Sequence, residues 1–142
     1  MDKELAVQSL TDTMAKFTAY IGKCLPKDVK SKLIELKTLE TNPLAKSIYD
    51  SMDENQEAAD RLNRPSCQDT GVIQYFVEAG AHFPLLGELQ EILREATEEA
   101  TRTGPLRHNA VETFDEKNTG TNTGTQIPVS YTHLTLPTIC SV

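Results

Sequence analysis

The chain has 142 residues, enough for one domain with a core of its own. It carries 14 Lys and Arg against 21 Asp and Glu, and this formal charge of −7 argues against nucleic acid or an anionic membrane as a partner. No apolar run approaches the roughly 20 residues that a membrane helix needs, and the N-terminus lacks the apolar core of a signal peptide. We therefore expect a cytoplasmic protein with reduced thiols.

The first 62 residues are predicted to form three helices. In the first, apolar residues alternate at spacings of three and four, which predicts one buried stripe. That stripe consists of Val7, Leu10, Met14, Phe17, Ile21 and Cys24. Cys24 is therefore expected to be a small buried side chain rather than a ligand.

Two further helices are predicted from proline positions. Pro26 suits the first turn of the second helix, and Asn42 is a candidate N-cap before Pro43 at the start of the third. The apolar face of the second helix consists of Val29, Leu33, Leu36 and Leu39. The inner face of the third is expected to consist of Leu44, Ile48 and Met52.

The composition changes at residues 63–65, where a polar connector leads into a short β-branched and aromatic run, residues 72–77. This run predicts a strand, and its nearly continuous apolar character predicts burial on both faces in a mixed sheet. A fourth helix follows and ends at Gly104-Pro105. Its inner face is expected to consist of Leu85, Leu89, Ile92, Leu93 and Ala96. The fold class is thus α/β (α+β), with a helical region at 1–62 and the beginning of a catalytic-type domain at 63–128.

Residues 129–142 differ from the acidic sequence before them, since they carry no Asp, Glu, Lys or Arg. Residues 129–138 resemble the translation of a transposon-derived sequencing adapter, so we expect a non-native tail that should be excluded from fold reasoning. The alternative is a genuine edge strand rich in β-branched residues. If the tail is foreign, Tyr131, His133 and Cys140 have no function.

Cys67 stands just before the predicted strand, in the run Cys-Gln-Asp-Thr-Gly at residues 67–71. Gly71 permits a tight turn there, and backbone amides at such a junction can face an anion. Taken alone, the thiol can be a nucleophile, a metal or cluster ligand, or an inert buried group. Cysteines 24, 67 and 140 form no CxxC pair and no spacing typical of zinc.

Arg107 follows the end of the predicted fourth helix. Its planar guanidinium suits bidentate pairing with a carboxylate, although a plain surface role is the alternative. His82 and His108 have no visible partner in the sequence, so structural or surface roles are favoured for both. Residues 118–124 are rich in Thr, Gly and Asn and predict a flexible loop without the lysine of a phosphate loop.

Four segments, residues 64–71, 83–89, 105–111 and 118–124, occur in this order and together are specific. They resemble the α-type catalytic domain shared by L(+)-tartrate dehydratase and class I fumarase, a family of iron–sulfur hydro-lyases. The resemblance runs from the first helix to about Pro128, and the Cys-Gln-Asp-Thr-Gly run is its most telling part. The second and third segments are more similar to tartrate dehydratase than to fumarase.

The resemblance implies a set of roles. Three cysteines of the family hold a 4Fe–4S cluster whose fourth iron is open to substrate, and Cys67 matches the first of these ligands. Gln68 and Asp69 match substrate-contacting positions, with Asp69 close enough to the departing hydroxyl to help protonate it. Arg107 matches the residue that grips a substrate carboxylate. The other ligands and the base are expected downstream or in a β-type subunit or fused C-terminal domain of an oligomer.

The implied reaction is removal of water from a small 2-hydroxydicarboxylate, with L(+)-tartrate to oxaloacetate favoured over the malate–fumarate reaction. A non-catalytic helical interaction module is the remaining alternative. The chain resembles a truncated N-terminal fragment with one of three cluster ligands. We therefore expect the fragment alone to be inactive and to bind no stable cluster.

Overall fold

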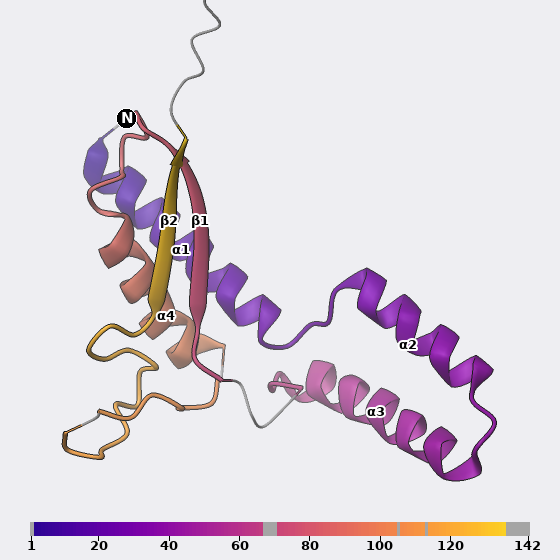
Figure 1. Cartoon of the computed structure of the whole chain (residues 1–142). Coiled ribbons are helices and arrows are strands. Elements are labelled where there is room, and N and C mark those ends of the chain that lie inside the picture. Colours follow the sequence, from indigo (N-terminus) through magenta and orange to yellow (C-terminus); the bar gives the residue numbers. More distant parts are fainter. Residues whose placement is uncertain (1, 67–70, 105, 113, 136–142) are drawn as a thin grey trace, which may run out of the picture.

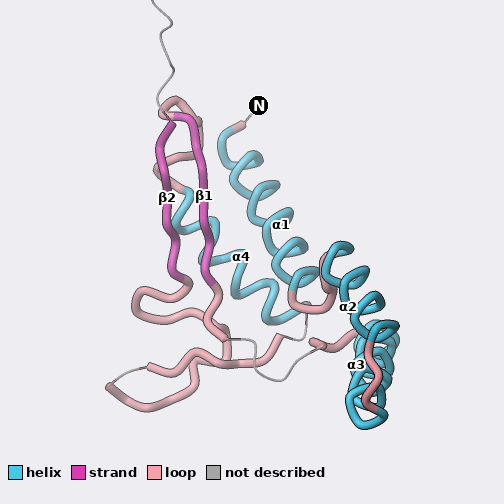
Figure 2. Tube along the Cα trace, turned by 45° about the vertical axis from the view of Figure 1, so that its right-hand side comes forward, coloured by secondary structure: helices cyan, strands magenta, loops and turns pink. Residues whose placement is uncertain are grey.

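The computed structural model describes residues 2–66, 71–104, 106–112 and 114–135. Its elements in chain order are α1 (Lys3–Ile21), α2 (Lys27–Leu39), α3 (Pro43–Leu62), β1 (Gln74–Gly80), α4 (Leu89–Thr103) and β2 (Val129–Thr135). Figures 1 and 2 show α1 and α4 beside the strands, and a hairpin of α2 and α3 that projects from this body. We call this hairpin, residues 27–62, the arm. The combination of helices and strands confirms the predicted α/β class.

The two strands pair in parallel, from Gln74 opposite Val129 to Gly80 opposite Thr135. A parallel pair needs a crossover connection, which α4 and the loop after it provide. Residues 129–135 belong to the predicted foreign tail, and here they form β2. Strand pairing does not reveal the origin of these residues, so the foreign tail stays a prediction.

The core lies on one face of the sheet, where Tyr75 of β1 packs with Leu89 and Leu93 of α4. All five residues predicted for the inner face of α4 are buried, but only four belong to the helix, because Leu85 lies in the turn before its start at Leu89. The prediction that β1 is buried on both faces is wrong: its burial alternates, and Phe76 is 77% exposed beside Tyr131, with ring centroids 5.0 Å apart. The reason is that α1 and α4 both cover the opposite face.

Helices α1 and α4 run side by side in the same direction. Lys3 pairs with Glu88 at one end of this packing, and Ala19 lies against Gly104 at the other. The buried stripe of α1 consists of Thr11, Ala15 and Thr18. The predicted stripe is therefore partly wrong, since its members Phe17 and Ile21 are each 53% exposed. Close approach of the helix backbones requires small side chains at the contact, which moves the larger residues to its edge.

Helix α3 begins at the predicted Asn42-Pro43, whereas Pro26, expected in the first turn of α2, is the N-cap that precedes it. Asn42 caps α3 by accepting a hydrogen bond from the Leu44 amide at 2.9 Å, and Asn63 ends the helix with a left-handed φ of 52°. The predicted inner face of α3 is wrong, because Leu44 and Ile48 are 71% and 56% exposed and Met52 is also exposed. No element in the described part of the chain covers that face.

The two arm helices meet through ion pairs more than through apolar packing. Lys37 of α2 lies 2.7 Å from a carboxylate oxygen of both Asp50 and Asp53 on α3. The hydrogen bonds that Lys37 donates to these two carboxylates raise its pKa above the ordinary value. Cys24 lies just before the arm and was expected to be buried. It is half-buried, with Sγ 4.0 Å from Oδ1 of Asp60.

No helix among the described residues is long and apolar enough to cross a membrane.

Candidate active site

The predicted site residues fall in two places. Cys67, Gln68 and Asp69 lie outside the described residues, so their predicted roles remain untested. Arg107 lies exposed in the loop that follows α4. This loop sits at the end of the body where α1 and α4 end and the two strands begin (Figure 1).

Three of the four specific segments converge at this end. The side-chain amide of Asn109, two residues after Arg107, donates to the carbonyl of Gly71 at 3.4 Å. Gly71, with φ of +62°, therefore lies beside the Arg107 segment. The segment at residues 83–89 lies at the opposite end of β1, where its Leu85 and Leu89 are buried in a structural role.

Asn122, from the fourth segment, holds the backbone on both sides of His108. Its side-chain oxygen accepts from the Asn109 amide at 2.7 Å, and its nitrogen donates to the Arg107 carbonyl at 2.7 Å. The same nitrogen donates to the hydroxyl of Thr101 at 3.2 Å. Asn122 is 7% exposed and has φ of 59°, a left-handed conformation that asparagine tolerates better than most residues.

A buried series of hydroxyl groups leads from the body to this site. Tyr75 Oη lies 2.9 Å from Thr18 Oγ1 of α1 and 3.0 Å from Thr97 Oγ1 of α4. One turn further along α4, the Thr101 hydroxyl donates to the Thr97 carbonyl at 2.8 Å. Because each buried hydroxyl in this series has a partner, the loop is anchored to the body without a desolvation cost.

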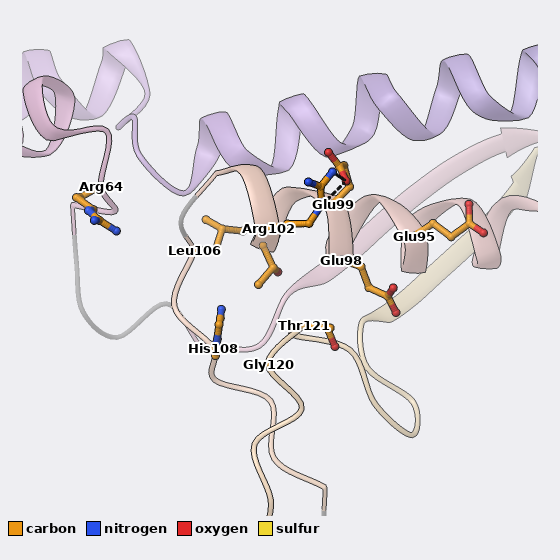
Figure 3. Close-up of a pocket in the computed structure, with 10 residues that line it drawn as sticks. Arg64, Glu95, Glu98, Glu99, Arg102, Leu106, His108, Gly120 and Thr121 are labelled. Carbon is orange, nitrogen blue, oxygen red and sulfur yellow. Dashed lines mark hydrogen bonds and ion pairs between the residues drawn. The ribbon is translucent and has the colours of Figure 1, made fainter.

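A cavity of about 730 Å³ lies between the C-terminal half of α4 and two loops, residues 106–111 and 118–124. Figure 3 shows Arg64 on one side of it, His108 and Thr121 below, and the glutamates of α4 along its upper wall. Arg64 belongs to the first of the four segments and comes three residues before Cys67 in the sequence. Leu106 lines this cavity and also a smaller one of about 240 Å³, which Gly71 and Asn122 line as well.

Two of the three glutamates of the cavity wall, Glu98 and Glu99, form ion pairs, and Glu95 is the third. Glu99 pairs with Arg102, and Glu98 accepts from Arg94 and, at 3.0 Å, from the Thr123 hydroxyl. These contacts neutralise much of the negative charge that the helix would otherwise present to an anion. The cavity therefore has Arg64 and His108 as basic groups on its far side, an arrangement compatible with a carboxylate ligand.

Arg94 also forms an ion pair on the solvent-facing side of α4. Hydrogen bonds from Arg94 hold the pKa of Glu91 below its ordinary value, with desolvation opposing the shift. Arg94 in turn has a raised pKa, first because of its hydrogen bond to Glu91. Arg94 thus joins Glu91 on the outer surface of α4 to Glu98, which lines the cavity together with Glu95 and Glu99.

No three His, Cys, Asp or Glu side chains come together as a metal site among the residues that the structure describes. Cys24, the one cysteine in the described ranges, lies near Asp60 at the base of the arm. The described side chains therefore do not form a cluster site by themselves.

Two residues of the site had weak signals in the sequence. His108 was expected to have a structural or surface role, and it lines the cavity. Asn122 was expected only to belong to a flexible loop, and it is buried. Its position in an Asn- and Gly-rich run was the available signal, since asparagine combines a left-handed backbone with a side chain that both donates and accepts.

Comparison with known proteins gives consistent results. Residues 11–136 match the family model described as fumarate hydratase (Fumerase). The chain is 56% identical over 127 residues to the L(+)-tartrate dehydratase subunit alpha of Escherichia coli (strain K12), and equally to that of Shigella boydii serotype 4 (strain Sb227). It is 34% identical over 110 residues to a putative L(+)-tartrate dehydratase subunit alpha of Methanocaldococcus jannaschii.

These matches cover most of this chain and less than half of each relative. They span 89% of the chain and 42% of the Escherichia coli and Shigella proteins, and 73% of the chain and 37% of the Methanocaldococcus protein. The chain thus spans about two fifths of the length of the curated relatives it matches.

Proposed function

Because the chain belongs to the fumarate hydratase (Fumerase) family, we propose that it supplies one side of the active site of an iron–sulfur-dependent hydro-lyase. The observation that carries this proposal is the convergence of Gly71, Leu106 of the Arg107 segment, and Asn122 around the smaller cavity of about 240 Å³. The three segments are far apart in the sequence, and their meeting at one surface indicates that they position side chains for binding. The substrate is a small 2-hydroxydicarboxylate.

Within this proposal Arg107 binds a substrate carboxylate through its planar guanidinium. Gln68 and Asp69 contact the substrate, and Asp69 donates a proton to the departing hydroxyl. Hydroxide is a poor leaving group, so protonation as the carbon–oxygen bond breaks lowers the barrier. The contact between Asn109 and Gly71 supports this pairing of roles, because it places the ends of the two segments together.

Cys67 is the proposed cluster ligand of this chain. A 4Fe–4S cluster with one open iron supplies a Lewis acid for the hydroxyl when it is bound. The described residues offer no competing metal site, so the remaining cysteine ligands are proposed to come from the part of the relatives' length that this chain does not span. This chain alone is accordingly proposed to be inactive.

L(+)-tartrate is the favoured substrate because the relatives at 56% identity are named L(+)-tartrate dehydratase subunit alpha. Malate and fumarate are the alternative, since the matching family model is described as fumarate hydratase. Turnover of the complete enzyme on L(+)-tartrate and on malate distinguishes the two. A complete enzyme that turns over neither compound supports the non-catalytic interaction module instead.

The partner is proposed to be a β-type subunit or a fused C-terminal domain, in an oligomer. The printed names of the relatives, which call each an alpha subunit, support a second type of subunit. Exposed apolar side chains on the arm and on the outer face of the sheet also support large additional contacts. A cytoplasmic location fits the free thiol of Cys24, because reducing conditions preserve thiols and cluster ligands alike.

We also propose that residues 129–142 are foreign. Their resemblance to a translated adapter supports this, whereas the pairing of β2 with β1 and the family match through residue 136 are what a native strand would produce. Resequencing the source gene beyond Pro128 tests the proposal. A native reading frame that encodes the same tail would refute it.

The ligand role is tested by Cys67→Ser in the complete enzyme, with iron content and hydro-lyase activity as measurements. We expect loss of activity with depleted or unstable cluster iron, because serine replaces a thiolate that the cluster requires. Cys24→Ser is the matched control and should retain activity, since that thiol lies at the base of the arm near Asp60. A Cys67→Ser enzyme with full cluster content and wild-type turnover would reject the assignment.

A further inference from the structure

We propose that Asn122 is a positioning residue that fixes Arg107 for carboxylate binding, acting through the backbone rather than on the substrate. This inference rests on the proposed function, because it presumes that Arg107 binds the substrate. Asn122 belongs to the loop at residues 118–124, which the roles assigned to Cys67, Gln68, Asp69 and Arg107 do not include.

The hydrogen bonds of Asn122 assign its side chain without ambiguity. The Asn109 backbone N–H can only donate and the Arg107 carbonyl can only accept, so the Asn122 oxygen must face the first and its nitrogen the second. The Thr101 hydroxyl already donates to the Thr97 carbonyl, so it accepts the second hydrogen of the Asn122 amide. All three bonds are thus fixed in direction.

These three bonds hold the short segment that carries Arg107. One bond lies on the carbonyl of Arg107 itself and another on the amide two residues later, so the peptide units between them have little freedom to rotate. The third bond ties this clamp to the buried end of α4, where Thr101 is 3% exposed. The backbone of Arg107 is thereby held in place, although the residue is exposed and lies in an irregular loop.

Asn122 also has to be asparagine for a backbone reason. Its φ of 59° is left-handed, which disfavours most side chains other than glycine, asparagine and aspartate. Glycine would keep the backbone and lose all three side-chain bonds. Aspartate would keep the backbone and the bond from Asn109, but it would set a carboxylate oxygen against the Arg107 carbonyl.

Asn122→Asp is therefore the sharpest test, made in the complete, assembled enzyme. With L(+)-tartrate, or malate if that is the compound turned over, we expect kcat/KM to fall about 10- to 100-fold. The matched control is Asn63→Asp, which makes the same chemical change at another left-handed asparagine, with φ of 52°, where the side chain accepts from Lys23. That control should change kcat/KM less than about twofold.

A double-mutant cycle with Arg107→Ala distinguishes positioning from general damage. If Asn122 acts through Arg107, then Asn122→Asp changes kcat/KM less than about twofold once Arg107 is alanine. Equal losses from Asn122→Asp in both backgrounds would overturn the inference while leaving the carboxylate role of Arg107 intact. A neutral Arg107→Ala would overturn that proposed role and this inference with it.

Thr101→Val keeps the cycle informative if Asn122→Asp fails to fold. It removes the hydroxyl that accepts from Asn122 and leaves the two bonds to the Arg107 segment in place. We expect a loss of about threefold in kcat/KM that vanishes in the Arg107→Ala background. An unchanged kcat/KM in Thr101→Val, or a loss that persists in that background, would contradict the clamp.

Discussion

The Tyr75 hydroxyl joins three elements at the centre of the body. The Thr97 hydroxyl donates to the Leu93 carbonyl at 2.8 Å, so at the 3.0 Å contact Tyr75 must be the donor. Thr18 then donates to Tyr75 at 2.9 Å. A single phenol thus acts as donor to α4 and as acceptor for α1, and β1 is fixed against both helices.

Tyr75→Phe removes this link and changes little else. We expect the free energy of unfolding to fall by about 1–2 kcal/mol, because the buried Thr18 hydroxyl loses its acceptor. Urea unfolding at neutral pH measures the change. Tyr20→Phe is the matched control, since that side chain is 60% exposed and the change should stay within about 0.5 kcal/mol. Equal effects of the two substitutions would show that the buried hydroxyl contributes nothing.

At the residue scale, sequence patterns found the strand that carries Tyr75 but not the bonds that its hydroxyl makes. The same holds for the site: Arg107 was a candidate because arginine suits carboxylates, whereas Asn122 was not. The hydrogen bond from Asn122 to Arg107 joins residues 15 apart in the chain, and such a bond produces no periodic pattern in the sequence. Only the folded backbone reveals it.

At the element scale, α1 and α4 approach each other through small residues at their C-terminal ends. A Cβ on Gly104 would stand 2.5 Å from the Cβ of Ala19 and 2.7 Å from the Ala100 carbonyl oxygen. Real Cβ atoms do not come this close, so the helices would have to move apart. The glycine that ends α4 is therefore required by packing, since its φ of −94° is open to any residue.

Gly104→Ala is accordingly expected to lower the free energy of unfolding by about 1–3 kcal/mol through overpacking. The Gly87→Ala variant is the control, because an added Cβ there would meet nothing within 4 Å. Urea unfolding curves of the two variants give the comparison. If Gly104→Ala matched Gly87→Ala, the close contact between α1 and α4 would be wrong.

The other end of this helix pair is joined by an ion pair. Lys3 lies 2.5 Å from Glu88, and its hydrogen bond holds the pKa of Glu88 below the ordinary value. A lowered carboxyl pKa stabilises the fold above the unfolded-state pKa, and this contribution is lost as pH falls through the folded-state pKa.

Lys3→Ala should therefore raise the pKa of Glu88, as measured by a carbon NMR titration of its carboxyl group. The stability difference between wild type and variant should shrink as the pH is lowered from neutral into the acid range. Glu91 provides an internal control, because its lowered pKa comes from Arg94 and should not respond. An unshifted Glu88 in the variant would disprove the pair.

The start of α3 and the end of α4 were predictable, whereas the strand expected at residues 72–77 lies at Gln74–Gly80 and α4 begins only at Leu89. Asn42 and Pro43 marked the start of α3, and Gly104 marked the end of α4, because capping and proline geometry act locally. The buried faces of α1, α3 and β1 were less predictable. They depend on which elements lie opposite, and in the described structure nothing lies opposite Ile48 or Phe76.

At the scale of the whole molecule, large apolar side chains remain uncovered on two surfaces. One is the arm, where Leu39, Leu44, Ile48 and Leu62 are each more than half exposed. The other is the outer face of the sheet, where Phe76 and Tyr131 stack. Exposed large apolar side chains gathered on a surface favour association, so we expect the chain alone to self-associate.

Ile48→Glu tests this expectation on the arm. Because Ile48 is 56% exposed, the substitution should change the free energy of unfolding by no more than about 0.5 kcal/mol. It should also raise the monomeric fraction in sedimentation velocity, since it places a charge within the apolar face of α3. Ser51→Glu adds the same charge to an exposed position of the same helix, and it should leave the monomeric fraction nearer to wild type. Global unfolding of Ile48→Glu would instead mean that this face is buried, in contradiction to the exposure on which the partner proposal relies.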